Sequence, residues 1–142
     1  MDVDTETGDV RVLGHVACDD AGTILNRMVV DGQVHGGVAQ GVGLALFEKF
    51  GYDDGNPLTA NLTTYLIPTA ATLPMFTVDH TETETPENPL GAKGIGEAGT
   101  IGSTPAVVNA VIDALSPFGI RHLDMPMTPS KIWEGVTDGP HE

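Results

Sequence analysis

The sequence has few basic residues, a single cysteine and no long apolar run, and each shortage excludes a class of protein. Its 142 residues include 20 Asp and Glu but only 6 Lys and Arg, so the formal net charge is -14. Nucleic acids and anionic membrane surfaces are bound through clusters of Lys and Arg, so neither partner is expected. No stretch approaches the roughly 18 apolar residues of a membrane-spanning helix, so membrane insertion is not expected either.

The single cysteine and the N-terminal residues indicate the cellular location. Cys18, the one cysteine, cannot form an internal disulfide or build a cysteine-based metal site alone. We expect it to be a small, buried strand residue. The first ten residues have neither the basic region nor the apolar core of a targeting peptide, which predicts a cytoplasmic, highly soluble acidic protein.

The apolar pattern predicts one domain of the α+β class, with a small mixed sheet and about three helices. Strands are expected over residues 10–18, 75–84 and 120–126. A first helix is expected over residues 33–50. A second is expected to begin with Ser103 or Thr104 as N-cap and to end at Pro117. A third is expected over residues 128–136, with Thr128 as N-cap and Pro129 in its first turn. In the second strand, His80 lies beside acidic residues and is expected to be solvated.

The N-terminal strand predicts a hairpin with a missing arm. Residues 10–18 follow a turn signal at Thr7 and Gly8, but only the letters MDVD precede that turn. Four residues are too few for a strand of ordinary length. We therefore expect the chain to begin inside a larger architecture, with 1–142 as a single fragment of it.

The helix over 33–50 is unusually rich in glycine. Each glycine in a helix interior costs about 1 kcal/mol relative to alanine, and there are four: Gly36, Gly37, Gly41 and Gly43. Close approach of another backbone or of a ligand would offset this cost. The polar groups of the same segment are Gln33, His35 and Gln40, for which structural hydrogen bonding is the alternative to ligand contact.

Residues 94–99, GIGEAG, have the GxGxxG spacing of dinucleotide-binding loops without the surroundings of one. That fingerprint follows an apolar strand and needs an acidic residue about 20 positions later. Here a proline-containing loop precedes Gly94, and the next acidic residue, Asp113, lies inside the expected helix. No Gly-Lys-Ser or Gly-Lys-Thr completes a P-loop either. A nucleotide-binding module is therefore kept only as an alternative.

Glu97 is the unusual residue of this stretch. It is the only acidic residue of segment 88–112, in a chain that has 20. Small neighbours, Gly96 and Ala98, let other backbones approach and shield the carboxylate little, which suits a general base. The structural alternatives are that Glu97 caps the following helix or pairs with Lys93.

Three stretches together resemble a known family: GQVHGGVAQGVGLALFE, NPLGAKGIGEAGTIGSTPAVVNAVIDAL and HLDMPMTPSKIWEGV. They are similar to the C-terminal end of the large subunit of the molybdenum hydroxylases, the xanthine dehydrogenase and aldehyde oxidoreductase family, and most similar to its aerobic carbon-monoxide-dehydrogenase-type branch. The resemblance implies a molybdopterin-binding domain and a molybdenum–molybdopterin cofactor, often in the cytosine dinucleotide form. It implies hydroxylation with oxygen from water and electron transfer to an iron-sulfur small subunit and a flavin medium subunit.

The resemblance also implies roles for individual residues. Glu97, in the KGxGE stretch, would be the general base beside the metal, and Gln40, in the GGxxQG stretch, would approach the cofactor. Backbone at the glycines would lie against pterin and phosphate groups, and no metal ligand is expected from the chain. The expected cofactor-binding residues are Gln40, Gly36, Gly37, Gly41, Lys93, Gly94 and Gly96, with Gly99, Thr100, Ile101 and Ser103 as neighbours of the dinucleotide.

The family's large subunit is several times longer than this chain. Its substrate loop and first molybdenum domain lie upstream of the matching stretches. The resemblance therefore implies a site completed by another polypeptide, the remainder of the large subunit, with carbon monoxide, aldehydes and purines all open as substrates. The alternatives are a non-catalytic remnant and a fragment of an aldehyde or purine hydroxylase-type subunit; the isolated chain is expected to be inactive.

Overall fold

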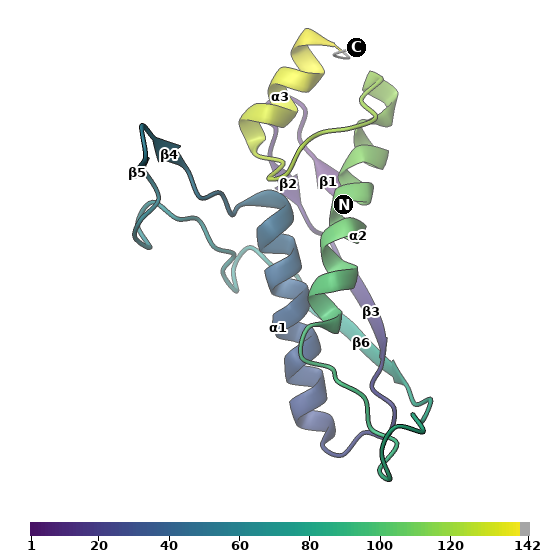
Figure 1. Ribbon diagram of the computed structural model, residues 1–142. Helices are drawn as coiled ribbons and strands as arrows, with labels where there is room; N and C mark the ends of the chain where they lie inside the picture. The colour runs from purple at the N-terminus through teal and green to yellow at the C-terminus, as the bar shows by residue number, and fades with distance from the viewer. Residues whose placement is uncertain (140–142) are drawn as a thin grey trace.

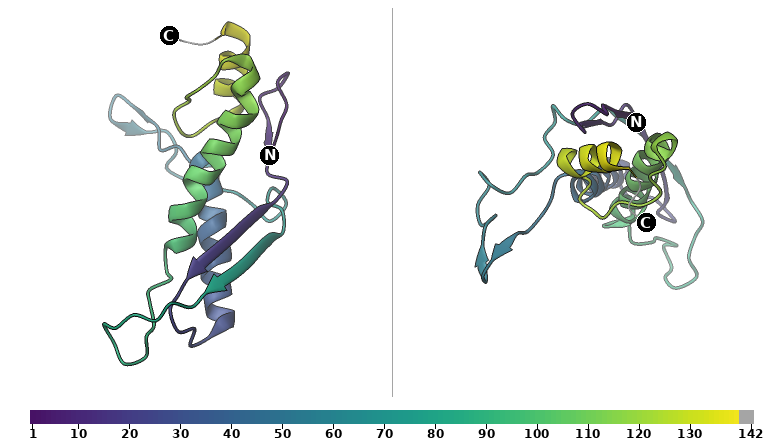
Figure 2. Two further views of the ribbon diagram at one scale, coloured as in Figure 1. Left: turned by 90° about the vertical axis from the view of Figure 1, so that its right-hand side faces the viewer. Right: turned by 90° about the horizontal axis from the view of Figure 1, so that it is seen from above.

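Two long helices form the body of the molecule. The computed structural model describes residues 1–139, in which α1 (Arg27–Leu46) and α2 (Ala98–Leu115) lie side by side (Figures 1 and 2). A 3-10 turn, η1 (Ser116–Phe118), ends α2, and α3 (Pro129–Asp138) packs at the same end of the helix pair. The expected α+β class with three helices and small sheets is confirmed.

Helix α1 is longer at its start than the sequence predicts. Its N-cap is Asn26, whose side chain accepts a hydrogen bond from the N–H of Val29 at 3.2 Å. It ends at Leu46, earlier than residue 50: Phe47 still donates to the carbonyl of Gly43 as in a helix, but the N–H of Glu48 turns back to the same carbonyl, each at 2.9 Å. One stripe of α1 is buried: Val30, Val34, Val38 and Val42.

Helix α2 begins at Ala98, five residues before Ser103, so the expected N-cap at Ser103 or Thr104 is wrong. The reason is tertiary: the first turns of α2 pack on α1, and this contact outweighs the start signal of Pro105, which lies inside the helix on its exposed side. The hydroxyl of Thr104 donates to the carbonyl of Thr100 at 3.1 Å instead of capping. Helix α3 agrees with the expectation, with Thr128 at its N-cap position and Pro129 in its first turn.

A two-stranded parallel sheet lies along the helix pair. It joins β3 (His15–Asp20) to β6 (Phe76–Thr81), in a register that runs from His15 opposite Phe76 to Asp20 opposite Thr81. The expected strand over 10–18 is divided, because β2 (Val10–Arg11) pairs instead with β1 (Asp2–Val3) in an antiparallel hairpin. The first arm of the hairpin, which was expected to be missing, is therefore present as β1.

Residues 120–126 form no strand, contrary to expectation. Ile120 is buried against the helices, and the N–H of Met127 donates to the carbonyl of Ala45 at 2.8 Å. The segment therefore crosses the end of α1 as an irregular chain held by burial.

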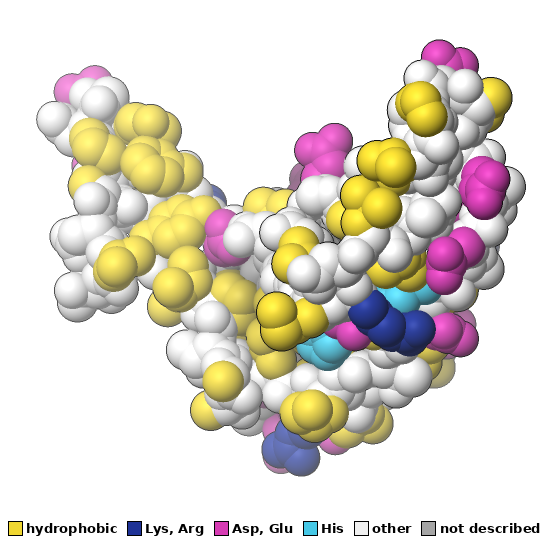
Figure 3. Space-filling model, turned by 90° about the horizontal axis from the view of Figure 1, so that it is seen from below, with side chains coloured by type: hydrophobic (Ala, Val, Ile, Leu, Met, Phe, Trp, Pro, Cys, Tyr) yellow, Lys and Arg dark blue, Asp and Glu magenta, His cyan; other side chains and the backbone are white. Residues whose placement is uncertain are grey.

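Residues 47–74 form an arm that projects away from the helix pair (Figures 1 and 2). Its tip is a small antiparallel hairpin of β4 (Tyr52–Asp53) and β5 (Asn56–Pro57). Hydrophobic side chains gather on the arm (Figure 3). Those exposed by more than half are Phe50, Tyr52, Leu58, Leu62, Leu66 and Ile67.

The core has two parts. The larger lies between α1, α2 and α3 and contains Leu115, Met127 and Ile132, all nearly fully buried. The smaller joins Ala17 of β3 to the valines of α1. Within residues 1–139 we find no helix with the length and apolar character needed to cross a membrane.

Candidate functional site

The glycines of α1 and α2 meet where the two helices touch. A Cβ added at Gly37 would lie 2.9 Å from the backbone nitrogen of Thr100, and one added at Gly41 would lie 2.6 Å from Cβ of Ser103. From the other side, a Cβ at Gly99 would lie 2.8 Å from the carbonyl oxygen of Val34. At these positions, close approach of a second backbone explains why glycine is present despite its cost in a helix.

Two hydroxyl groups fasten this contact. Thr100 donates to the carbonyl of Gly37 at 3.0 Å, and Ser103, which is 2 % exposed, donates to the carbonyl of Val38 at 3.1 Å. The contact therefore engages Gly37, Gly41, Gly99, Thr100 and Ser103 within the chain itself. Ile101 lies between them on the opposite side of α2 and is 65 % exposed.

A second group of glycines is open. A Cβ added at Gly36, Gly94 or Gly96 would meet no atom within 4 Å among the described residues. Gly94 and Gly96 line a hollow at the start of α2, together with Glu97, Ala98 and Ile101. At these positions the backbone is accessible to a group from outside the chain.

Glu97 is one of the residues that line this hollow. Glu97 occupies the N-cap position of α2, and its backbone carbonyl accepts from the N–H groups of Thr100 and Ile101 at 3.1 and 3.2 Å. Its side chain makes no capping bond, and Lys93 pairs with Asp20 instead. The expected alternative of a pair with Lys93 is therefore wrong, whereas the capping alternative holds for the position of Glu97 but not for a side-chain hydrogen bond. Within residues 1–139 the exposed side chain of Glu97 has no hydrogen-bond or ion-pair partner.

Asp20 anchors the loop that carries Glu97. Its Oδ1 atom accepts from the N–H groups of Gly22 and Thr83 at 2.8 and 3.1 Å and lies 3.2 Å from Nζ of Lys93. The N–H of Lys93 also donates to the carbonyl of Ala21 at 2.9 Å. These bonds tie the loop before Glu97 to the end of β3. The Lys93 ammonium is thus committed to a structural ion pair.

Acid is expected to weaken this anchor. Hydrogen bonds from the Thr83 hydroxyl and from the Gly22 and Thr83 N–H groups, with Lys93 a smaller cause, hold the pKa of Asp20 well below its usual range. A folded-state pKa below the unfolded one contributes stability that is present above about pH 4 and is lost as the pH falls below it. In urea titrations from pH 6 to pH 3, the free energy of unfolding should fall more steeply for the wild type than for Asp20→Asn. Parallel curves would contradict this assignment.

Gln40 lies on the exposed side of α1, next to Gly41. Its Nε2 donates to Oε1 of Glu48 at 2.7 Å, and Oε2 of Glu48 accepts from the hydroxyl of Tyr65 at 2.5 Å. The sequence reasoning missed both Glu48 and Tyr65. The sequence signal that could have pointed to this place is the glycine at position 43 of the helix. In the structure, a Cβ added at Gly43 would lie 2.5 Å from Oε1 of Glu48.

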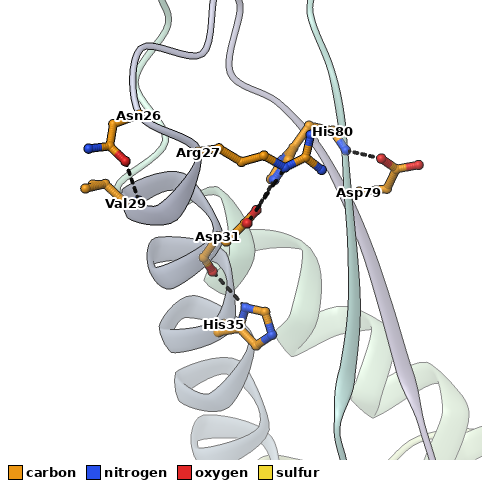
Figure 4. Close-up of polar contacts among 7 residues, drawn as sticks. All are labelled: Asn26, Arg27, Val29, Asp31, His35, Asp79 and His80. Atoms are coloured by element: carbon orange, nitrogen blue, oxygen red, sulfur yellow. Dashed lines mark hydrogen bonds and ion pairs between the residues drawn. The ribbon is translucent and has the colours of Figure 1, made fainter.

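Two further expectations are wrong. The side chain of His80 is 2 % exposed rather than solvated, and its Nε2 lies 2.6 Å from Oδ1 of Asp31 on α1 (Figure 4). This bond holds the pKa of Asp31 below its usual range. Cys18 is exposed, because it lies on the face of the β3–β6 sheet that no helix covers. Of the other polar residues of α1, His35 bonds the carbonyl of Asp31 at 2.8 Å.

The described residues contain no group of three or more His, Cys, Asp or Glu side chains that could hold a metal ion. The hollow instead offers open glycine backbone, a carboxylate and the first turn of α2, whose leading N–H groups lack intrahelical acceptors. The open backbone and the free N–H groups suit contact with a hydrogen-bonding organic group, whose anionic parts would have to lie away from the Glu97 carboxylate.

The chain belongs to the molybdopterin cofactor-binding domain family, whose model matches residues 1–74. It is 40% identical over 139 residues to the carbon monoxide dehydrogenase large chain of Hydrogenophaga pseudoflava, covering 97% of this chain and 17% of that protein. It is 41% identical over 148 residues to the nicotine 6-hydroxylase large subunit of Paenarthrobacter nicotinovorans, covering 100% of this chain and 18% of that protein. The chain thus spans about a sixth of the length of these relatives.

Solved structures of related enzymes indicate the same family. The chain matches quinoline 2-oxidoreductase from Pseudomonas putida 86 with a TM-score of 0.93 and 40% identity, over 97% of this chain and 18% of that one. It matches a Cu,Mo-CO dehydrogenase with a TM-score of 0.90 and 36% identity, over 96% and 17%. The resemblance to the molybdenum hydroxylase large subunit is confirmed, and similarity of nearly equal strength extends to enzymes named for different substrates.

Proposed function

We propose that the chain is the C-terminal part of the molybdopterin-binding domain of a molybdenum-dependent oxidoreductase of the carbon-monoxide-dehydrogenase type. In this proposal Glu97 is the general base, and another polypeptide, the remainder of the large subunit, completes the site. The observation that carries the proposal is the exposed carboxylate of Glu97, which has no partner within residues 1–139 and lines a hollow with Gly94 and Gly96.

The residues present fit a molybdopterin cofactor, which we expect in its cytosine dinucleotide form. Backbone at Gly36, Gly94 and Gly96 is open enough to lie against pterin and phosphate groups. Gln40 supplies an amide on the exposed side of α1. The cofactor supplies the redox chemistry when bound, and the protein residues supply hydrogen bonds and a proton acceptor.

The other expected contacts follow from position. We assign Ile101, exposed at the rim of the hollow, to direct contact with the dinucleotide. For Gly37, Gly41, Gly99, Thr100 and Ser103, which are buried or half-buried in the helix contact, we propose an indirect role: they fix the approach of α1 and α2 beside the hollow. Lys93, paired with Asp20, holds the loop that precedes Glu97 in its conformation.

Glu97 would act on a proton of the oxygen nucleophile or substrate. An oxygen of its carboxylate takes the proton and holds it until release, which needs a free and correctly placed base. The absence of a capping bond leaves both carboxylate oxygens available for this step. The open glycine backbone beside Glu97 leaves room for the substrate to approach.

The exposed apolar surface supports a completing polypeptide. The arm over 47–74 exposes large hydrophobic side chains, and the β3–β6 sheet is covered by helices on one face only (Figures 1 and 3). Parallel sheets are normally buried on both faces, and large exposed apolar patches mark interaction sites. By resemblance, iron-sulfur and flavin subunits would complete the electron path.

Metal analysis tests the proposal. The chain produced alone should contain no molybdenum, whereas the chain produced together with the polypeptide that completes the large subunit should purify as a complex with close to one molybdenum per complex. A complex without molybdenum would contradict the proposal and favour a non-catalytic remnant. Activity on an aldehyde or purine, but not on carbon monoxide, would move the chain to another branch of the family.

A further inference from the structure

Glu48 lies between two groups that are distant in the sequence. One of its oxygens accepts from Nε2 of Gln40 on α1 at 2.7 Å, and the other accepts from the hydroxyl of Tyr65 in the arm at 2.5 Å. Both contacts are within the range of strong, charge-assisted hydrogen bonds. The carboxylate therefore connects the exposed side of α1 to the arm.

The end of α1 is shaped to hold Glu48 in this place. Helix α1 stops at Leu46, and the N–H of Glu48 turns back to the carbonyl of Gly43 at 2.9 Å. This turn lays the Glu48 carboxylate over Gly43, where a Cβ would come within 2.5 Å of Oε1 and 2.9 Å of Cδ of Pro68. Only glycine at position 43 leaves room for the carboxylate and the arm together.

The contact determines how the Gln40 amide is oriented. A carboxylate has acceptors and no donor, so the amide must turn its NH2 group toward Glu48. The carbonyl oxygen and the second N–H of Gln40 then remain on the exposed side. Without Glu48, the terminal torsion of a glutamine is broad and roughly two-fold, and the two amide orientations become interchangeable.

We propose that Glu48 is a positioning residue, which fixes the Gln40 amide so that its carbonyl oxygen and second N–H are presented in one orientation to the molybdopterin cofactor, and that Tyr65 holds Glu48 in place. This inference rests on the cofactor contact of Gln40 in the proposed function. It extends the cofactor site to the arm.

The first test needs no cofactor. The hydrogen bond to Glu48, with smaller contributions from burial and from the Glu48 charge, raises the pKa of Tyr65 above its usual value. The chain has two tyrosines, Tyr52 and Tyr65, so Tyr52→Phe isolates the titration of Tyr65 by ultraviolet absorbance. Adding Glu48→Gln should lower the pKa of Tyr65, whereas adding Glu134→Gln, a change on the exposed side of α3, should not. An unchanged Tyr65 titration in Glu48→Gln would overturn the inference.

The second test measures cofactor retention in the complex with the completing polypeptide. Changes in residues that orient a direct ligand typically weaken binding by about 10- to 100-fold, so Glu48→Gln and Gln40→Ala should each reduce molybdenum content on dialysis by a comparable factor. Their combination should be no worse than Gln40→Ala alone, because both remove the same contact. Glu134→Gln should retain the wild-type content.

A reciprocal exchange separates positioning from simple structural support. Combining Gln40→Glu with Glu48→Gln preserves a carboxylate–amide hydrogen bond between the two positions but presents a carboxylate outward. Thermal stability should be close to wild type, while molybdenum should still be lost; retention of the metal would overturn the inference. If Gln40→Ala alone retains molybdenum, the cofactor contact in the proposed function fails and this inference with it. If only Glu48→Gln retains molybdenum, the positioning role alone fails.

Discussion

Glu97→Gln should lower the kcat of the assembled complex by about 10²- to 10⁴-fold, the range for removing a general base. The substitution preserves the size of the side chain and removes its capacity to accept a proton. Because the Glu97 carboxylate makes no capping bond and no ion pair within residues 1–139, its loss should disturb neither α2 nor the loop before it. Molybdenum content and thermal stability should therefore be unchanged. Steady-state kinetics, with metal analysis of the same preparation, measures both quantities.

The matched control is Glu134→Gln, which makes the same chemical change on the exposed side of α3. It should leave kcat and molybdenum content at wild-type values. Wild-type turnover in Glu97→Gln would overturn the assignment of the base. Loss of molybdenum from Glu97→Gln would instead give Glu97 a role in cofactor binding.

Gly99→Ala and Gly102→Ala should change stability in opposite directions, although both lie on α2. A Cβ at Gly99 would come within 2.8 Å of the carbonyl oxygen of Val34, a backbone atom that cannot rotate away, whereas a Cβ at Gly102 would meet no atom within 4 Å. Overpacking at a close contact costs about 1–3 kcal/mol, and alanine at an open helical position gains up to about 1 kcal/mol over glycine. Urea unfolding of the full chain, followed by helical circular dichroism, measures the difference.

The same comparison can be made on α1. Gly37→Ala places a Cβ 2.9 Å from the backbone nitrogen of Thr100 and should destabilise, while Gly36→Ala is open and should stabilise. A stabilised Gly99→Ala or Gly37→Ala would mean that the helices do not approach as closely as described. Gly36→Ala has a second use: stabilisation together with loss of molybdenum from the complex would support contact between cofactor and backbone at that position.

The helix contact and the site depend on one another. Gly99 packs against Val34 only two residues after Glu97, so the approach of the two helices determines where the Glu97 carboxylate lies. On the other side, the loop before Glu97 is tied to β3 through Asp20 and Lys93. The backbone on both sides of Glu97 is thus fixed by its neighbours, while the side chain itself makes no capping bond.

Local sequence signals predicted the elements well and several of their boundaries poorly. The valine stripe of α1, the alternating strand β6 and helix α3 agree with their patterns. Helix α2 begins five residues before Ser103, because packing on α1 organises residues that carry no helix signal of their own. Segment 120–126 has a strand-like composition, but burial against the helices and the bond from Met127 to Ala45 hold it as an irregular chain.

The sequence by itself identified the family, through the resemblance of its motif letters, and predicted the α+β class, because neither needs the positions of atoms in space. It also singled out Glu97 and Gln40 as candidate site residues, and their roles stay predictions. Tertiary structure alone decided which glycines are used for helix contact and which are open, since this depends on atoms more than 60 residues away in the chain. It also decided that His80 is buried against Asp31, and that Glu48 and Tyr65 act with Gln40. Hydrogen-bond partners are chosen by distance in space, and sequence spacing does not reveal that distance.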